Sequence, residues 1–71
     1  MKKGQVCIKT AGRKAGKHCV IIETSNFPIV LYANGKKKKS NPLHLWFTNI
    51  EIDIKDEKKA TEKLKELDLN G

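Results

Sequence analysis

The 71-residue sequence lacks any apolar run approaching the roughly 18–20 residues that a helix needs to span a bilayer. Its basic start, residues 1–4, is not followed by the hydrophobic segment of a signal peptide. We therefore expect a cytoplasmic protein without a membrane partner. The chain is also too short for a large enzyme with a deep substrate cleft, and its length predicts one small domain.

Cysteine is scarce, with Cys7 and Cys19 alone. Nothing in the sequence indicates secretion, and cytosolic thiols usually stay reduced, so we expect both to be small buried hydrophobes. His18 and His44 complete a set of four possible metal ligands. However, structural zinc sites usually show a Cys-x-x-Cys or a close His pair, and the sequence has neither. We expect no bound metal and no cofactor.

Groupings typical of catalysis are missing too. The sequence shows no Ser–His–Asp arrangement and no recognisable Cys–His pair, and its basic half contains no cluster of acids. His18 and Cys19 are neighbours in a predicted strand, where successive side chains point to opposite faces and cannot form a dyad. We therefore expect neither an enzyme nor a small-molecule substrate.

Acidic residues are nearly absent from the first two thirds of the chain. Residues 1–47 carry ten Lys and Arg side chains against Glu23 alone, whereas residues 48–71 carry five Lys against seven acids. The whole chain has a formal net charge of +7. This split predicts a basic binding region over residues 1–48 and a C-terminal extension over residues 49–71.

Apolar and β-branched runs between turn signals predict five strands, at residues 5–10, 18–24, 29–33, 36–40 and 43–47. Asn34-Gly35 predicts a two-residue type I′ hairpin. The lysines that follow it suit an edge strand. Because no helix separates the strands, parallel βαβ units are excluded. We expect an all-β core, a small five-stranded, partly open SH3-like barrel.

The C-terminal extension has a different pattern. Isoleucines alternate with polar residues over residues 50–54, which predicts an extended segment with one apolar face. Asp56 is a plausible N-cap for a helix over residues 56–67, in which Ala60, Leu64 and Leu67 form a thin apolar stripe. We expect this helix to lie on the barrel or on a partner, and the last residues to fray.

The candidate binding residues are basic, and we expect them to contact phosphates rather than to read bases. They are Lys2, Lys3, Arg13, Lys14, Lys17, Lys36, Lys37, Lys38, Lys39 and His44. Gly12, Gly16 and Gly35 are expected to hold backbone turns that need a positive φ. Strand alternation allows only one of Trp46 and Phe47 to face inward. The other stacks on a base or packs on a neighbouring protein, and the sequence leaves both open.

Residues 4–22 resemble a KOW motif, which consists of a strand, a loop with a central glycine and a second strand. Gly12 matches the central glycine, and Gly16 matches the small residue before the returning strand. The elements that follow are similar, in their order, to the archaeal large-subunit ribosomal protein of the L-fourteen-e type. The matching parts are the basic run at 36–41, the pair 44–45, residues 50–54 and the Lys/Glu-rich helix.

The chain departs from that pattern at two places. Its basic run contains only lysine where the family usually has arginine, and lysine lacks the bidentate fork that reads base edges. Trp46-Phe47 stands where the family has a more polar pair, Glu-Pro.

The resemblance implies a structural constituent of the large ribosomal subunit. Such a protein binds ribosomal RNA through the basic loop and the lysine-rich strand, and it adjoins other ribosomal proteins. The alternative is a KOW or SH3-like protein-interaction module associated with transcription elongation. Those modules normally sit in longer chains beside other domains, and the positive charge favours RNA.

Overall fold

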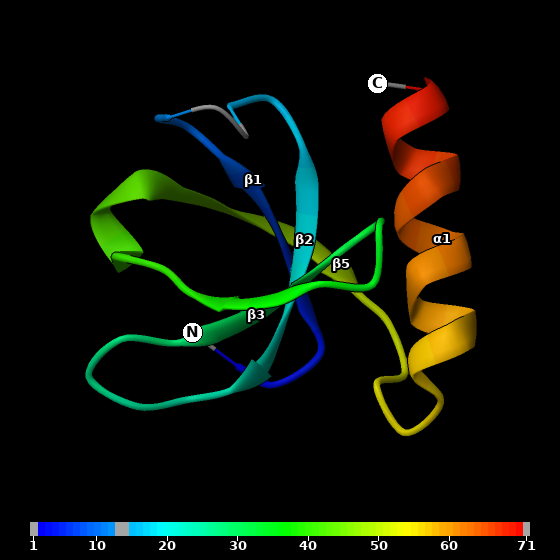
Figure 1. Cartoon of the computed structure of the whole chain (residues 1–71), viewed down its shortest axis with the longest axis horizontal. Coiled ribbons are helices and arrows are strands. Elements are labelled where there is room, and N and C mark those ends of the chain that lie inside the picture. The colour runs from blue at the N-terminus through cyan, green and yellow to red at the C-terminus, as the bar shows by residue number, and fades with distance from the viewer. Residues whose placement is uncertain (1, 13–14, 71) are drawn as a thin grey trace.

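The fold is one antiparallel sheet with a helix packed on it, seen in a computed structural model that describes residues 2–12 and 15–70 (Figure 1). Over these residues the elements are β1 (Gln5–Lys9), β2 (His18–Glu23), β3 (Ile29–Tyr32), β4 (Lys37–Lys39), the 3-10 helix η1 (Pro42–His44), β5 (Leu45–Glu51) and α1 (Glu57–Asn70). The strand order is β4-β3-β2-β1-β5, and every neighbouring pair is antiparallel. The expected five-stranded β core is confirmed.

The sheet is buried on both faces, because successive residues of its central strands point to opposite sides. One face carries the inner cluster, made of Cys7, Cys19, Ile21, Val30, Tyr32 and Leu45 with the half-buried Phe47. The other face carries the helix-side cluster, made of Val6, Val20, Leu31, Ala60 and Leu64 with partly buried Ile22, Ala33, Ile52, Ile54 and Leu67. The expectation that β2 is buried on both faces is confirmed, since Cys19, Val20 and Ile21 are all inaccessible to solvent.

The helix α1 covers β2 and β3 and begins at the predicted cap. Asp56 Oδ1 accepts the backbone N–H groups of Lys58 at 3.1 Å and Lys59 at 3.4 Å. Ala60 and Leu64 are buried against the sheet, so the helix lies on this chain's own β core. Burial of a leucine side chain contributes about 1.5–3 kcal/mol, which compensates for the thinness of the stripe.

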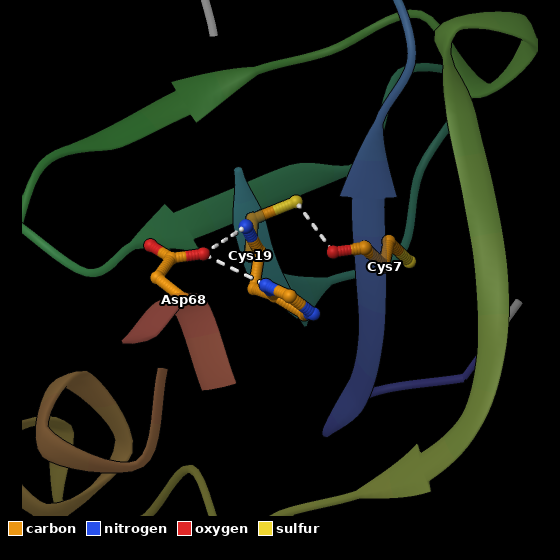
Figure 2. A network of polar contacts seen from close by, with 4 residues as sticks. Cys7, Cys19 and Asp68 are labelled. Atoms are coloured by element: carbon orange, nitrogen blue, oxygen red, sulfur yellow. Dashed lines mark hydrogen bonds and ion pairs between the residues drawn. The ribbon is translucent and has the colours of Figure 1, made fainter. Parts of the chain in front are cut away.

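The C-terminal end of α1 was expected to fray after residue 67, and this is wrong. Figure 2 shows why: Asp68 reaches back to the start of β2. Its Oδ1 accepts the backbone N–H of His18 at 2.8 Å and lies 2.7 Å from His18 Nδ1. A tertiary contact therefore holds the last turn, which runs to Asn70.

The Asn34-Gly35 hairpin is also not the predicted type I′ turn, because that turn needs a positive φ at both central residues. Gly35 has a φ of +84°, but Asn34 does not have a positive φ. Gly35 N–H donates to the Tyr32 carbonyl at 2.9 Å, and Tyr32 N–H donates to the Lys36 carbonyl at 2.9 Å. The loop thus has three residues and ends in a left-handed glycine, while Asn34 Oδ1 accepts the Lys36 N–H at 3.0 Å.

The fifth strand was expected over residues 43–47, and its start is wrong. Leu43 and His44 lie in η1, where Asn41 Oδ1 accepts the Leu43 N–H at 3.0 Å and Pro42 fits the first turn. The strand continues to Glu51, across the expected boundary at residue 48. Beyond it, Ile52 N–H donates to the Gly4 carbonyl at 2.8 Å. A Cβ on Gly4 would lie 2.7 Å from the Ile52 carbonyl oxygen, so the chain needs glycine there.

Candidate nucleic-acid interface

The loop between β1 and β2 is closed by backbone hydrogen bonds at its base. Lys9 N–H donates to the Lys17 carbonyl at 3.0 Å, and Gly16 N–H donates to the Lys9 carbonyl at 2.7 Å. Gly12 and Gly16 have φ values of +81° and +84°, as expected. An added Cβ at either glycine would meet nothing within 4 Å, so backbone conformation rather than space demands glycine. Arg13 and Lys14 lie outside the described residues.

The lysines of β4 are exposed, and the strand register sends them to different faces of the sheet. Lys38 lies opposite Val30 of the inner cluster, whereas Lys37 lies opposite Leu31 of the helix-side cluster. On that side Lys37 Nζ forms an ion pair with Glu57 Oε1 at 2.5 Å. Lys37 is thereby directed toward the start of α1.

A groove of about 550 Å³ lies where the β1–β2 loop meets β4, and we call it the lysine groove. It is lined by Lys9, Ala11, Gly12, Lys17, Tyr32, Lys38 and Lys39. Lys9, Tyr32 and Lys38 all belong to the face of the sheet that carries the inner cluster, so the groove lies on that face. The structure thus lines one groove with four lysines, which come from β1, the β1–β2 loop and β4.

Lys9 and Tyr32 were not among the predicted site residues. Lys9 Nζ donates to Ser40 Oγ at 2.6 Å, which fixes its side chain between β1 and the residue after β4. Burial raises the pKa of the Tyr32 phenol above its ordinary value, with the nearby Cys19 adding to the shift, so the phenol stays neutral at pH 7. One signal was available in the sequence. Lys9 continues the inward side of β1 two residues after Cys7, where a cation requires a polar partner.

The other predicted residues are placed less uniformly. His44 is exposed, and its carbonyl accepts the Thr10 N–H at 2.8 Å, so it stands at the base of the loop. Lys36 lies between the hairpin loop and β4, and its carbonyl accepts the Tyr32 N–H. Lys2 and Lys3 are exposed but precede β1, at the end of that strand opposite the β1–β2 loop (Figure 1). The structure therefore does not bring Lys2 and Lys3 to the groove.

The two thiols belong to the core. Cys7 and Cys19 are free and buried, as expected, and Cys19 Sγ donates to the Cys7 carbonyl at 3.6 Å (Figure 2). Burial raises the pKa of Cys7 to about 11 and that of Cys19 to about 12, so both stay protonated and unreactive at neutral pH. Across the described part of the chain, no three His, Cys, Asp or Glu side chains are grouped to hold a metal ion.

The aromatic pair of β5 divides as the strand alternation predicts. Phe47 is half-buried against the inner cluster, whereas Trp46 is 67% exposed. Trp46 lies opposite Ile8 of β1, and Lys9 lies opposite Leu45. Because Ile8 and Lys9 are neighbours in one strand, Trp46 and the lysine groove are on opposite faces of the sheet.

The fold and the groove define the class: a small, basic β-sheet protein with a lysine-lined binding surface. No protein-family model matches the chain. Curated relatives do match. They are archaeal proteins named large ribosomal subunit protein eL14, at 39% identity over 64 residues in Methanococcus maripaludis, covering 87% of this chain and 80% of the relative.

Two further relatives of the same name come from other archaea. The protein of Desulfurococcus amylolyticus is 36% identical over 74 residues, covering 96% of this chain and 77% of the relative. That of Sulfolobus acidocaldarius is 42% identical over 57 residues, covering 72% and 59%. This chain belongs to the eL14 family of large ribosomal subunit proteins, which confirms the resemblance seen in the sequence. The family is not enzymatic. Within the described residues, no helix has the length and apolar character to cross a membrane.

Proposed function

We propose that the chain binds ribosomal RNA of the large subunit through the lysine groove and the β1–β2 loop, as a structural constituent of that subunit. The observation that carries this proposal is the convergence of Lys9, Lys17, Lys38 and Lys39 on one groove. Four like charges around one groove repel one another, so their grouping favours a polyanion as the partner. A phosphate backbone fits because it carries a regular series of negative charges.

The proposed mechanism is neutralisation of phosphates with release of counterions. Lysine acts as a point charge and lacks the planar fork of arginine, so these contacts position the RNA without reading its sequence. Gly12 lines the groove without a side chain, which lets an RNA backbone approach the loop closely. The remaining candidates are proposed as additional phosphate contacts: Lys2, Lys3, Arg13, Lys14, Lys36, Lys37 and His44.

The ion pair of Lys37 does not stand against this role. Both partners are about half exposed, with side-chain accessibilities of 46% and 54%. An exposed ion pair contributes only about 0–1 kcal/mol, so a phosphate can replace Glu57 as the partner of Lys37. Even so, Lys37 should contribute less to RNA binding than Lys38, because Lys38 lines the groove and Lys37 does not.

We further propose that the sheet is a partly open SH3-like barrel. The unit expected over residues 1–48 then includes the rest of β5 to Glu51, and the residues after β5 are its extension. The inner cluster supports the closure, because it joins Val30 and Tyr32 of β3 to Leu45 and Phe47 of β5. The hydrogen bond from Lys9 to Ser40 also links β1 to the chain leaving β4. Among the described residues no ladder joins β4 to β5, so the opening lies between these strands.

The test is the salt dependence of binding to a transcript of large-subunit ribosomal RNA. If about four to seven lysine and arginine side chains contact phosphates, log K is expected to fall with log salt at a slope of roughly −3 to −6. A slope near zero would refute the electrostatic mechanism. Sedimentation tests the alternative, a protein-interaction module associated with transcription elongation. A ribosomal constituent stays with the large subunit through a high-salt sucrose cushion, whereas a transcription factor washes off.

A further inference from the structure

The strand β5 forms the second edge of the sheet and lacks the lysines and prolines that usually protect an edge, although its register with β1 shifts between Gln5 and Cys7. It is seven residues long and, over the described residues, pairs only with β1. Its sequence from Leu45 to Glu51 contains no lysine and no proline, the residues that proteins use to block strand addition at exposed edges. A long, nearly uncharged edge of this kind is a template for a further strand.

The apolar surface beside this edge is left uncovered by the helix. Trp46 is 67% exposed and lies opposite Ile8, which α1 leaves only half-buried. Along the same strand Ile50 is 39% exposed, and Leu43 just before it is 87% exposed. Tryptophan is the residue most enriched at energetically important positions of protein interfaces. Edge and side chains together suit an occupant that has both a backbone to pair and apolar groups to pack.

The charges around β5 distinguish among three possible partners: RNA, a second copy of the chain and a basic protein segment. Residues 40–54 contain no lysine or arginine, in a chain that has fifteen, and they carry Glu51 and Asp53. An RNA backbone here would meet carboxylates without a cation from this segment, and the lysine groove lies on the opposite face. A second copy of the chain would bring two molecules of net charge +7 together and set acid against acid. A basic protein segment meets neither obstacle.

We propose that β5 is a docking edge for a basic, extended segment of another protein, which adds as a further strand and covers Trp46. The backbone of that segment pairs with the free side of β5, its apolar residues pack on Trp46 and Ile8, and its cations face Glu51 and Asp53. This inference does not depend on RNA binding by the lysine groove, because it concerns the other face of the sheet.

Site-specific photo-crosslinking in assembled large subunits tests the proposal. The chain carries p-benzoylphenylalanine at position 46, and a matched control carries it at position 27, where the native Phe27 is 53% exposed in the β2–β3 connection. Position 46 is expected to crosslink to a lysine- or arginine-rich segment of another protein, and position 27 is not. Crosslinks from position 46 to a nucleotide, to a second copy or to an acidic segment would each overturn the proposal, as would none at all.

Two further measurements separate this proposal from the RNA-binding one. Those backbone amides of residues 45–51 that point away from β1 are expected to exchange at least about tenfold more slowly in the subunit than in the free chain, since strand addition gives them partners. Unchanged exchange would overturn strand addition.

The Trp46→Ser variant is expected to lose the protein contact while keeping the affinity and salt slope of the free chain for ribosomal RNA. A loss of RNA affinity equal to that of Lys38→Gln would assign the surface to RNA instead.

Discussion

The two edges of the sheet meet solvent with opposite chemistry. The β4 edge is three residues long and consists of Lys37, Lys38 and Lys39. The β5 edge is seven residues long and exposes an aromatic and an aliphatic side chain, with Glu51 as its single charge. One or two lysines suffice to prevent strand addition, so the β4 edge has more lysines than protection requires, and the β5 edge has no lysine.

This difference indicates that each edge is fitted to its own kind of partner. A lysine-rich edge is costly to bring near another cation and favourable beside phosphates. An apolar edge is costly to leave in water and favourable beside another strand. Within one small sheet, the two compositions thus separate a polyanion surface from a protein surface, and substitutions at each edge can be compared directly.

The largest effect is expected from neutralising the β4 edge by changing to Gln the lysines Lys36, Lys37, Lys38 and Lys39. Affinity for ribosomal RNA at ~0.1 M salt should fall roughly a hundredfold, since each lost phosphate contact removes about tenfold there and at least two are lost. The melting temperature should hardly change, because exposed charges contribute little to stability. Filter binding over a salt series, with thermal denaturation, measures both.

The matched control changes the same number of lysines on the helix, namely Lys58, Lys59, Lys63 and Lys65, to Gln. Its net charge equals that of the edge variant, but its substitutions lie away from the lysine groove. A much smaller loss of RNA affinity is expected. Equal losses in the two variants would mean that net charge, and not the β4 edge, determines binding.

The next effect compares two neighbours on the β5 edge. Phe47→Ala is expected to destabilise the protein by about 2–3 kcal/mol, because its ring packs on the inner cluster. Trp46→Ala in the free chain should cost less than about 1 kcal/mol, because its ring is mostly in solvent. Denaturant unfolding of the two variants measures the difference. A similar loss from both would show that Trp46 serves the fold of the free chain and not a partner.

A smaller effect separates the two faces of the β4 edge. Lys38→Gln should reduce RNA affinity about tenfold at ~0.1 M salt, the contribution of one phosphate contact. Lys37→Gln should reduce it less, because Lys37 is directed toward Glu57. The same binding assay applies to both single variants. Equal losses would indicate that RNA surrounds the segment on both sides.

The smallest effect concerns the thiols of Cys7 and Cys19 in the inner cluster, which reaches the two edges through Phe47 of β5 and through Val30, opposite Lys38 of β4. Burial raises the pKa of these thiols from 9.0 to about 11 and about 12. Above about pH 9 the unfolded chain therefore loses thiol protons that the folded chain keeps, so stability should fall as the pH rises toward 11. Cys7→Ala with Cys19→Ala should make this fall shallower in denaturation curves recorded across that pH range.

Much of the sheet was predictable because its signals are local. The alternation and apolar runs of residues 5–23 define β1 and β2, and two glycines mark the loop between them. The cap at Asp56 was equally visible. The hairpin type was not, since Asn-Gly is compatible with more than one turn, and the pairing of Tyr32 with Lys36 selects the three-residue form.

The composition and local pattern of this protein can be seen without its structure: a basic first part, a strand-rich pattern, a loop with two glycines, an all-lysine run and a family resemblance. Which of these residues come into contact depends on the folded structure. It joined Lys9 to Ser40, Asp68 to His18 and Lys37 to Glu57. It also placed Trp46 and the lysine groove on opposite faces. The physical reason is that charge, propensity and periodicity act between near neighbours in sequence, whereas these contacts depend on sheet register and on how the helix packs.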